Sequence, residues 1–211
     1  MNFGELQSAV LARLNMGSDD PAATNVGSLV NEALHMVEVA HPNGWGYLTR
    51  TVTASVSTST YTFGQISTTS TVARVLSAKA RVDTVWRPLE ITSPDEADAH
   101  WNSTSETGAP EAMWVEGQTF TMYPAPDTTY GLTFRVVISE PDLAATTDSP
   151  LLPERFHGAI IAGALVLYYE TLQDTNRSQA AAARFDGWIG RMMTALREQR
   201  GLPRVRLRGD T

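Results

Sequence analysis

The chain has 211 residues, of which 42% are hydrophobic and 18% are charged, and this balance excludes a disordered protein. The formal net charge is −7. The last twelve residues hold four arginines against one aspartate, a charge of +3, so the other 199 residues carry −10. This negative charge disfavours general binding to nucleic acid. The absence of cysteine excludes disulfides, thiolate metal sites and cysteine nucleophiles.

Hydrophobic periodicity predicts two helices at the beginning of the chain. Apolar residues recur every three or four positions over residues 3–16 and again over residues 25–40. The polar run NMGSDDP separates the two segments, and HPNGWG ends the second one. We expect no signal peptide, because the N-terminus lacks a basic segment followed by a long apolar run. We also expect no membrane span, because the longest apolar run, residues 158–169, is too short to cross a bilayer.

The middle of the chain is predicted to form β-strands. Thr and Ser alternate with Val52, Ala54 and Val56, which indicates a half-buried strand with a hydroxyl face rather than a mucin-like glycosylated stretch. The segment MWVEGQTFTMY predicts a hairpin that turns at Glu116-Gly117. Further strands are expected at residues 72–77, 80–91 and 130–138.

Further helices are predicted within and after the strand region. Ser93 and Glu96 have the spacing of a capping box, so a short helix is expected over residues 93–101. Residues 154–173 are apolar almost all round, which predicts a central buried helix, and residues 176–199 form an amphipathic one.

This order of elements predicts an α+β fold. We expect a helical domain built from the N- and C-terminal helix pairs, at residues 1–46 and 152–199. An antiparallel β domain at residues 47–151 is expected to be inserted between the two pairs, and residues 200–211 are expected to form an extended basic tail.

Two Glu-x-x-His pairs raise the alternative of a di-metal enzyme: Glu32 with His35, and Glu154 with His157. Di-iron carboxylate bundles use two such pairs and one glutamate from each of two further helices. The other helices offer only Glu5 and Glu198, both near helix ends, and His35 falls opposite the apolar stripe of its helix. The simpler interpretation is a solvated Glu32/His35 pair, a first-turn Glu154 favoured by the helix dipole, and a half-buried, hydrogen-bonded His157.

Common catalytic and nucleotide-binding motifs are absent from the sequence, and we predict a protein that is not an enzyme and has no cofactor. The carboxylates of Asp95, Glu96 and Asp98 resemble an acid/base cluster, but a solvated helix face explains them more simply. The large aromatic residues allow two interpretations, base stacking or packing in the core and in interfaces, and the acidic charge favours the second. These residues are Trp45, Tyr47, Trp86, Trp101 and Trp114.

Two stretches of the chain have a distinctive order of helices, turns and strands. The first runs from LVNEALHMV through HPNGWGYL to TRTVTASV and YTF. The second joins PEAMWVEGQTFTMYPAPDTTYGLTFRVV to DSPLLPERFHGAIIAGALVLYYE. Together they resemble the head-to-tail adaptor, or connector, proteins of tailed bacteriophages, especially those with a β domain inserted between terminal helices.

The resemblance implies a structural virion protein at the head–tail interface, assembled in the host cytoplasm. Such adaptors form a ring, usually a dozen copies, beneath the portal protein, extend the DNA channel and provide the platform for the tail or for a stopper or nozzle protein. Genomic DNA passes through without sequence-specific binding, and no membrane, cofactor or catalysis is implied. An acidic body suits such a channel, because it does not hold the phosphate backbone. Another virion assembly component, such as a stopper or tail-tube protein, is the alternative.

The C-terminal tail, RGLPRVRLRGDT, has two different faces when it is extended, because arginines alternate with two apolar residues. Burial of an apolar side chain contributes roughly 1.5–3 kcal/mol and an exposed arginine pair about 0–1 kcal/mol, so one tail alone binds weakly. We predict a strand that docks on the portal. The alternatives are a frayed basic terminus with no partner and, as the lesser possibility, contact with DNA in the channel. The docking residues are Arg200, Pro203, Arg204, Val205, Arg206, Leu207 and Arg208.

Overall fold

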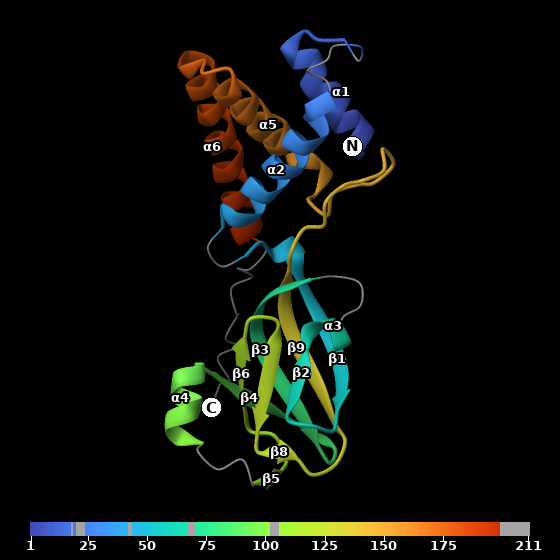
Figure 1. Cartoon of the computed structure of the whole chain (residues 1–211), viewed down its shortest axis with the longest axis vertical. Helices are drawn as coiled ribbons and strands as arrows, with labels where there is room; N and C mark the ends of the chain where they lie inside the picture. The colour runs from blue at the N-terminus through green and yellow to red at the C-terminus, as the bar shows by residue number, and fades with distance from the viewer. Residues whose placement is uncertain (18, 20–23, 42–43, 67–70, 102–105, 199–211) are drawn as a thin grey trace, which may run out of the picture. The chain divides into compact units, whose positions relative to one another are not determined.

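The computed structural model of the chain describes all residues except 18, 20–23, 42–43, 67–70, 102–105 and 199–211 (Figure 1). In this part of the chain the α-helices are α1 (Phe3–Leu14), α2 (Val26–Val39), α3 (Phe63–Ile66), α4 (Pro94–His100), α5 (His157–Thr171) and α6 (Thr175–Glu198). The strands are β1 (Thr49–Val56), β2 (Thr60–Thr62), β3 (Val72–Val82), β4 (Val85–Thr92), β5 (Thr107–Gly108), β6 (Ala112–Glu116), β7 (Thr119–Tyr123), β8 (Ala125–Pro126) and β9 (Tyr130–Ile138).

The chain divides into two compact units. The terminal unit consists of residues 1–47 and 142–211, and the central unit consists of residues 48–141. The predicted domains, 1–46 with 152–199 and 47–151, stay a prediction, because compactness does not show whether either unit folds alone.

Helix α5 is the centre of the terminal unit, as its uniformly apolar sequence predicts. Helices α1, α2 and α6 all pack against it (Figure 1). Gly163 lets two of these helices come close, because a Cβ at this position would lie 3.0 Å from the Cβ of Ala33 on α2 and 3.3 Å from the ring of Phe185 on α6. The predicted helices at both ends of the chain are confirmed, and α5 is preceded by a single 3₁₀ turn, Glu154–Phe156.

The loop that leads from the strands into α5 is fastened to the first two helices. The side-chain amide of Asn31 on α2 donates to the carbonyl oxygen of Leu143 at 3.1 Å and accepts from its N–H at 3.0 Å. At the start of α1, the backbone N–H of Phe3 donates to the carbonyl oxygen of Asp148 at 2.7 Å. These bonds join the two ends of the sequence into one unit, because they satisfy backbone groups of both segments at once.

A curled, seven-stranded sheet dominates the central unit (Figure 1). Its strands lie in the order β1-β9-β3-β4-β6-β7-β2. Phe134 on β9 and Phe120 on β7 are fully buried, and their ring centroids are 5.1 Å apart although three strands lie between them in the sheet order. The sheet therefore curls around an aromatic core, as the right-handed twist of strands allows.

Some of the predicted strands are confirmed, and others have the wrong boundary. The strand over 130–138 and the hairpin of β6 and β7 are confirmed, and Gly117 in the hairpin turn has a φ of 59°, a conformation that glycine adopts without strain. The predicted strands 72–77 and 80–91 have the wrong boundary. β3 runs unbroken to Val82, and the chain turns at Asp83, whose φ is 56°. Aspartate tolerates this left-handed conformation, so the turn needs no glycine.

The predicted fold class is wrong beyond its general α+β label. β4 and β6 pair in parallel, with Glu90 opposite Ala112, and the short strands β5 and β8 are also parallel. A parallel pair needs a crossover instead of a hairpin, and α4 lies in the segment that connects β4 to β6. Two of the six α-helices in the described residues, α3 and α4, belong to the central unit. The protein is thus a mixed α+β structure with a large curled sheet, and not a helical domain with an inserted antiparallel β domain.

A capping box begins α4, the helix of this crossover, and its contribution to stability can be tested. Ser93 Oγ accepts from the backbone N–H of Glu96 at 3.3 Å, and the Glu96 carboxylate accepts from the backbone N–H of Ser93 at 3.3 Å. We expect Ser93→Ala to lower the free energy of unfolding by about 1 kcal/mol and to speed amide hydrogen exchange in α4. Ser55→Ala, at an exposed serine of β1, is the control and should change stability by less than about 0.5 kcal/mol. Equal effects of the two substitutions would contradict the role of the cap.

Candidate functional site

In the first Glu-x-x-His pair, the contacts that the structure shows for His35 are with Glu38 and Asp142, and not with Glu32. His35 Nε2 lies 2.7 Å from Asp142 Oδ1, and His35 Nδ1 lies 3.3 Å from Glu38 Oε2. Partial burial opposes protonation of His35, but its hydrogen bonds to Asp142 and Glu38 outweigh this effect and raise the pKa of the imidazole above its ordinary value. Glu32 lies exposed on the same helix. Both ring nitrogens of His35 are therefore already paired with carboxylates of the same chain.

The second pair is split between the surface and the core. The Glu154 carboxylate is exposed and lies 3.0 Å from the amino nitrogen of Met1. His157 is only 3% exposed, more buried than predicted, and its Nε2–H donates to the carbonyl oxygen of Leu152 at 2.9 Å. Burial lowers the pKa of His157, so this imidazole is kept neutral as a packing residue.

The structure does not assemble the di-metal site. Within the described residues, no group of three or more histidine, aspartate or glutamate side chains is arranged to hold a metal ion. Glu5 is used in the capping box of α1, where its carboxylate accepts from the N–H of Asn2 at 2.9 Å. The side chain of Glu198 lies outside the described residues.

The acidic cluster on α4 is a solvated helix face. The side chains of Asp95, Glu96 and Asp98 are all exposed. The Glu96 carboxylate is occupied by the cap and by the hydroxyl of Thr92, which donates to it at 2.7 Å. That hydroxyl, followed by the N–H and hydroxyl of Ser93, lowers the pKa of Glu96, so this carboxylate stays ionised and serves the helix terminus.

The large aromatic residues have different environments. Trp45 is buried, and its Nε1–H donates to the carbonyl oxygen of Val37 at 2.6 Å, so it belongs to the core. Trp101 is half-buried in a stack, with ring centroids 6.1 Å from Trp114 and 5.3 Å from Tyr123. Trp86 is 45% exposed on β4. Tyr47 stacks on Trp45 at 6.4 Å. Packing explains Trp45 and Tyr47, while Trp86 and the Trp101 stack leave aromatic surface on the central unit.

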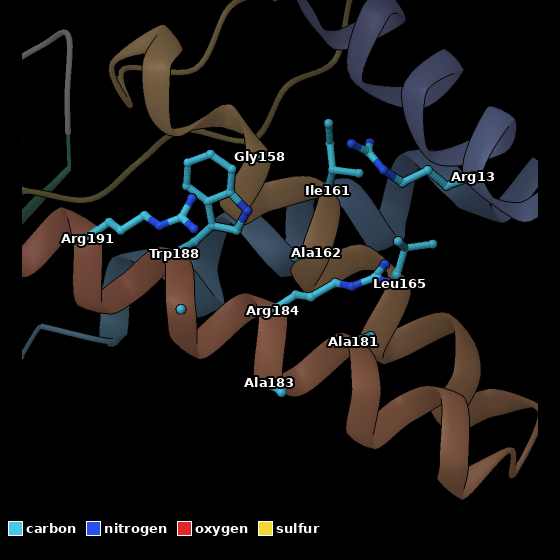
Figure 2. A pocket seen from close by; sticks show the side chains of 11 residues that line it. Arg13, Gly158, Ile161, Ala162, Leu165, Ala181, Ala183, Arg184, Trp188 and Arg191 are labelled. Carbon is cyan, nitrogen blue, oxygen red and sulfur yellow. The ribbon is translucent and has the colours of Figure 1, made fainter.

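The terminal unit contains a groove that the sequence analysis did not identify. This arginine groove has a volume of about 290 Å³ and lies between α1, α5 and α6 (Figure 2). Its floor is the apolar face of α5, and three arginines from the other two helices line its walls. The described lining residues are Arg13, Gly158, Ile161, Ala162, Leu165, Ala181, Ala183, Arg184, Gly187, Trp188 and Arg191. An adjoining hollow of about 310 Å³ shares Arg13 and Arg184 and adds Arg177.

Close packing of α5 and α6 builds one wall of the groove. The indole of Trp188 lies directly against Gly158, where a Cβ would be 2.4 Å from Trp188 Cζ2. The guanidinium of Arg191 in turn lies 5.0 Å above the centre of the Trp188 ring (Figure 2). This cation–π contact holds the charge in place while leaving the N–H groups at the guanidinium edge available to an acceptor.

The charge of the groove is concentrated and uncompensated by its own lining. Arg177, Arg184 and Arg191 are spaced by seven residues, or about two turns, so they follow one side of α6. No acidic residue is among the described lining residues. Asp174 lies 3.4 Å from Arg177, but Arg13, Arg184 and Arg191 make no ion pair with the described part of the chain. The groove is thus suited to a negatively charged partner.

None of the helices that the structure describes has the length and apolar character required to cross a membrane. The predicted docking residues Arg200, Pro203, Arg204, Val205, Arg206, Leu207 and Arg208 lie outside the described residues.

Comparison with known families identifies a structural protein of the phage virion. The sequence profile of the SU10 adaptor protein family matches residues 1–208. The chain therefore belongs to this family of phage head-to-tail adaptors, and the resemblance noted in the sequence is confirmed. Membership implies interaction with other virion components, such as the portal and the tail. No curated protein matches the chain.

The glycine at the base of the groove gives one prediction. We expect Gly158→Ala to lower the free energy of unfolding by about 1–3 kcal/mol, because the new methyl group overlaps Trp188. Gly190→Ala on α6 is the matched control, since nothing lies within 4 Å of the position of its Cβ. Alanine is the better helix former, so the control should be stabilised by up to about 1 kcal/mol. Urea unfolding of both variants measures the contrast, and two stabilised variants would refute the packing argument.

The two histidines give opposite pH dependences. In an NMR titration, His35 should titrate above the ordinary value of 6.5 and His157 below it. Because the pKa of His35 is raised on folding, its stabilising contribution is present below pH 6.5 and is lost as pH rises through the folded value. His35→Gln should therefore cost more stability at pH 5.5 than at pH 8.5, by at most about 1 kcal/mol because the side chain is partly solvated. A loss independent of pH would contradict the ion-pair assignment.

Proposed function

We propose that the protein forms a closed ring, of about a dozen copies, between the portal protein and the tail or a stopper protein. The observation that carries this proposal is the family match over residues 1–208, which covers nearly the whole chain and not a single motif. In this position the ring extends the channel for genomic DNA and forms the platform for tail attachment. The net charge of −7 per chain supports a channel role, because an acidic wall does not retain the phosphate backbone.

We also propose that residues 200–211 bind the portal protein. The alternation of arginines with Val205 and Leu207 supports an extended segment that adds to the edge of a partner's sheet. One such segment binds weakly, but tails presented together by a ring gain affinity through their high effective concentration. The arginines set orientation and charge match, and the apolar pair provides most of the affinity.

A stopper or tail-tube protein is the competing assignment within the virion. Electron microscopy of particles separates the alternatives by position, because an adaptor ring contacts the portal directly, whereas a tail-tube protein repeats along the tail. A ring in contact with the portal supports the proposal, and density repeated along the tail refutes it.

Deletion of residues 200–211 tests the docking segment. We expect the truncated chain to unfold at the same urea concentration as the full chain and to lose binding to particles that carry the portal protein. Val205→Ser with Leu207→Ser is the sharper variant, because it keeps every arginine and removes only the apolar face. It should also bind at least about tenfold more weakly, as expected from the loss of two buried apolar side chains. Normal binding by the truncated chain would show that the portal is contacted elsewhere.

A further inference from the structure

The terminal unit separates its positive and negative surfaces. The arginine groove lies on one side, between α1 and α6, and α2 carries a surface of opposite sign. We call this surface the acidic α2 face and define it by Glu32, Glu38 and Asp142. Glu38 and Asp142 also pair with His35, so the face sets three carboxylates against one imidazole and stays negative when His35 is protonated. Glu32 is exposed, and the Asp142 side chain is 71% exposed beside His35. Both surfaces belong to the same compact unit, so every copy of the chain presents both.

The groove combines an apolar floor with positively charged walls. Its floor is formed by Ile161, Ala162 and Leu165, and Leu165 lies one turn of α5 after the other two. On the wall formed by α6, Gly187 has open space beside it, because nothing lies within 4 Å of the position of its Cβ. Asp186 comes two residues after Arg184, so it falls on the other side of α6 and does not neutralise the wall. A helix of another molecule that turns acidic residues toward the groove therefore meets arginines, and the open space beside Gly187 lets it approach the groove floor.

We propose that the arginine groove of one copy binds the acidic α2 face of a second copy of this chain. The inference rests on the proposed ring and names the surface that joins its subunits. The two surfaces are different, so the contact is heterologous, and such head-to-tail contacts generate closed rings when the rotation between copies closes. Val39, which is 76% exposed at the end of α2, adds an apolar residue to the same surface.

Charge complementarity selects this occupant over nucleic acid. Guanidinium groups bind phosphate as well as carboxylate, so DNA is the other chemistry that fits the arginines. The 199 residues before the basic tail carry −10, and this charge opposes the approach of a polyanion. A second copy brings the acidic α2 face at the same concentration as the groove, and the pairing repeats at every junction of a ring.

Charge reversal of each surface, alone and together, tests the contact. The groove variant is Arg184→Glu with Arg191→Glu, the α2 variant is Glu32→Arg with Asp142→Arg, and the combined variant carries all four changes. The control, Arg87→Glu with Arg155→Glu, makes the same change in net charge at exposed arginines outside the groove. Rings are counted by electron microscopy on particles that carry the portal protein, and thermal unfolding of each variant checks its fold.

We expect the groove and α2 variants each to form at least about tenfold fewer rings, since like charges then face each other across the contact. The combined variant should recover ring formation, because the attraction is restored with the signs exchanged, and the control should assemble like the unaltered chain. If reversal lowers thermal stability, Arg184→Gln with Arg191→Gln replaces it, with an intermediate loss expected. Normal rings from the groove variant, or a combined variant that stays deficient, would overturn the proposal.

A crosslink provides an independent measurement, because the chain has no cysteine of its own. Arg184→Cys and Glu32→Cys in one chain, treated with a short bis-maleimide after assembly, should give a ladder of multimers. Neither single variant should give the ladder. Rings that form normally but give no ladder would refute this contact and leave the adaptor role intact. Failure of the unaltered chain to form any ring on portal particles would refute the proposed function itself, and this inference with it. Normal rings with lost DNA retention in the groove variant would assign the arginines to DNA instead.

Discussion

The close approach of α6 and α2 to α5 is the contact on which the terminal unit depends. The approach is closest at two glycines of α5: a Cβ at position 158 would overlap Trp188, and a Cβ at position 163 would lie 3.0 Å from the Cβ of Ala33. The same packing fixes the indole on which Arg191 rests. The same contact between helices therefore forms part of the core and one wall of the arginine groove. A change in this contact alters the charged surface as well.

The central unit is stabilised by different means. Its core is enclosed by a sheet that curls until Phe120 and Phe134 touch, and Phe63 from the short helix α3 adds a third ring, 5.3 Å from Phe120. Aromatic side chains suit this role, because each buries a large apolar area and makes favourable edge contacts with its neighbours. Each unit thus has an apolar core of its own.

Periodicity and capping signals are local, and they predicted the elements whose causes are local. The uniform apolar sequence of α5, the alternation in β9 and the Ser93/Glu96 box were sufficient for this reason. The parallel pairing of β4 with β6 was not predictable in the same way, because nothing within either strand states which neighbour it takes. For the groove, the seven-residue spacing of the arginines on α6 is visible in the sequence. Arg13, however, joins them only through the packing of α1 on α5.

Copies of an acidic chain repel one another through their like charges, and the proposed ring must overcome this repulsion. Repulsion between exposed charges is screened beyond about 8–10 Å at physiological salt, so the charges that meet at contact decide the outcome. In the proposed contact, the arginines of one groove face the carboxylates on α2 of the neighbouring copy, so the interaction there is attractive. A copy that approached with its groove facing the groove of its neighbour would place arginine against arginine. In the proposed ring, the same separation of charge that attracts neighbouring copies would also fix the direction of their contact, which a closed ring needs and an unordered aggregate lacks.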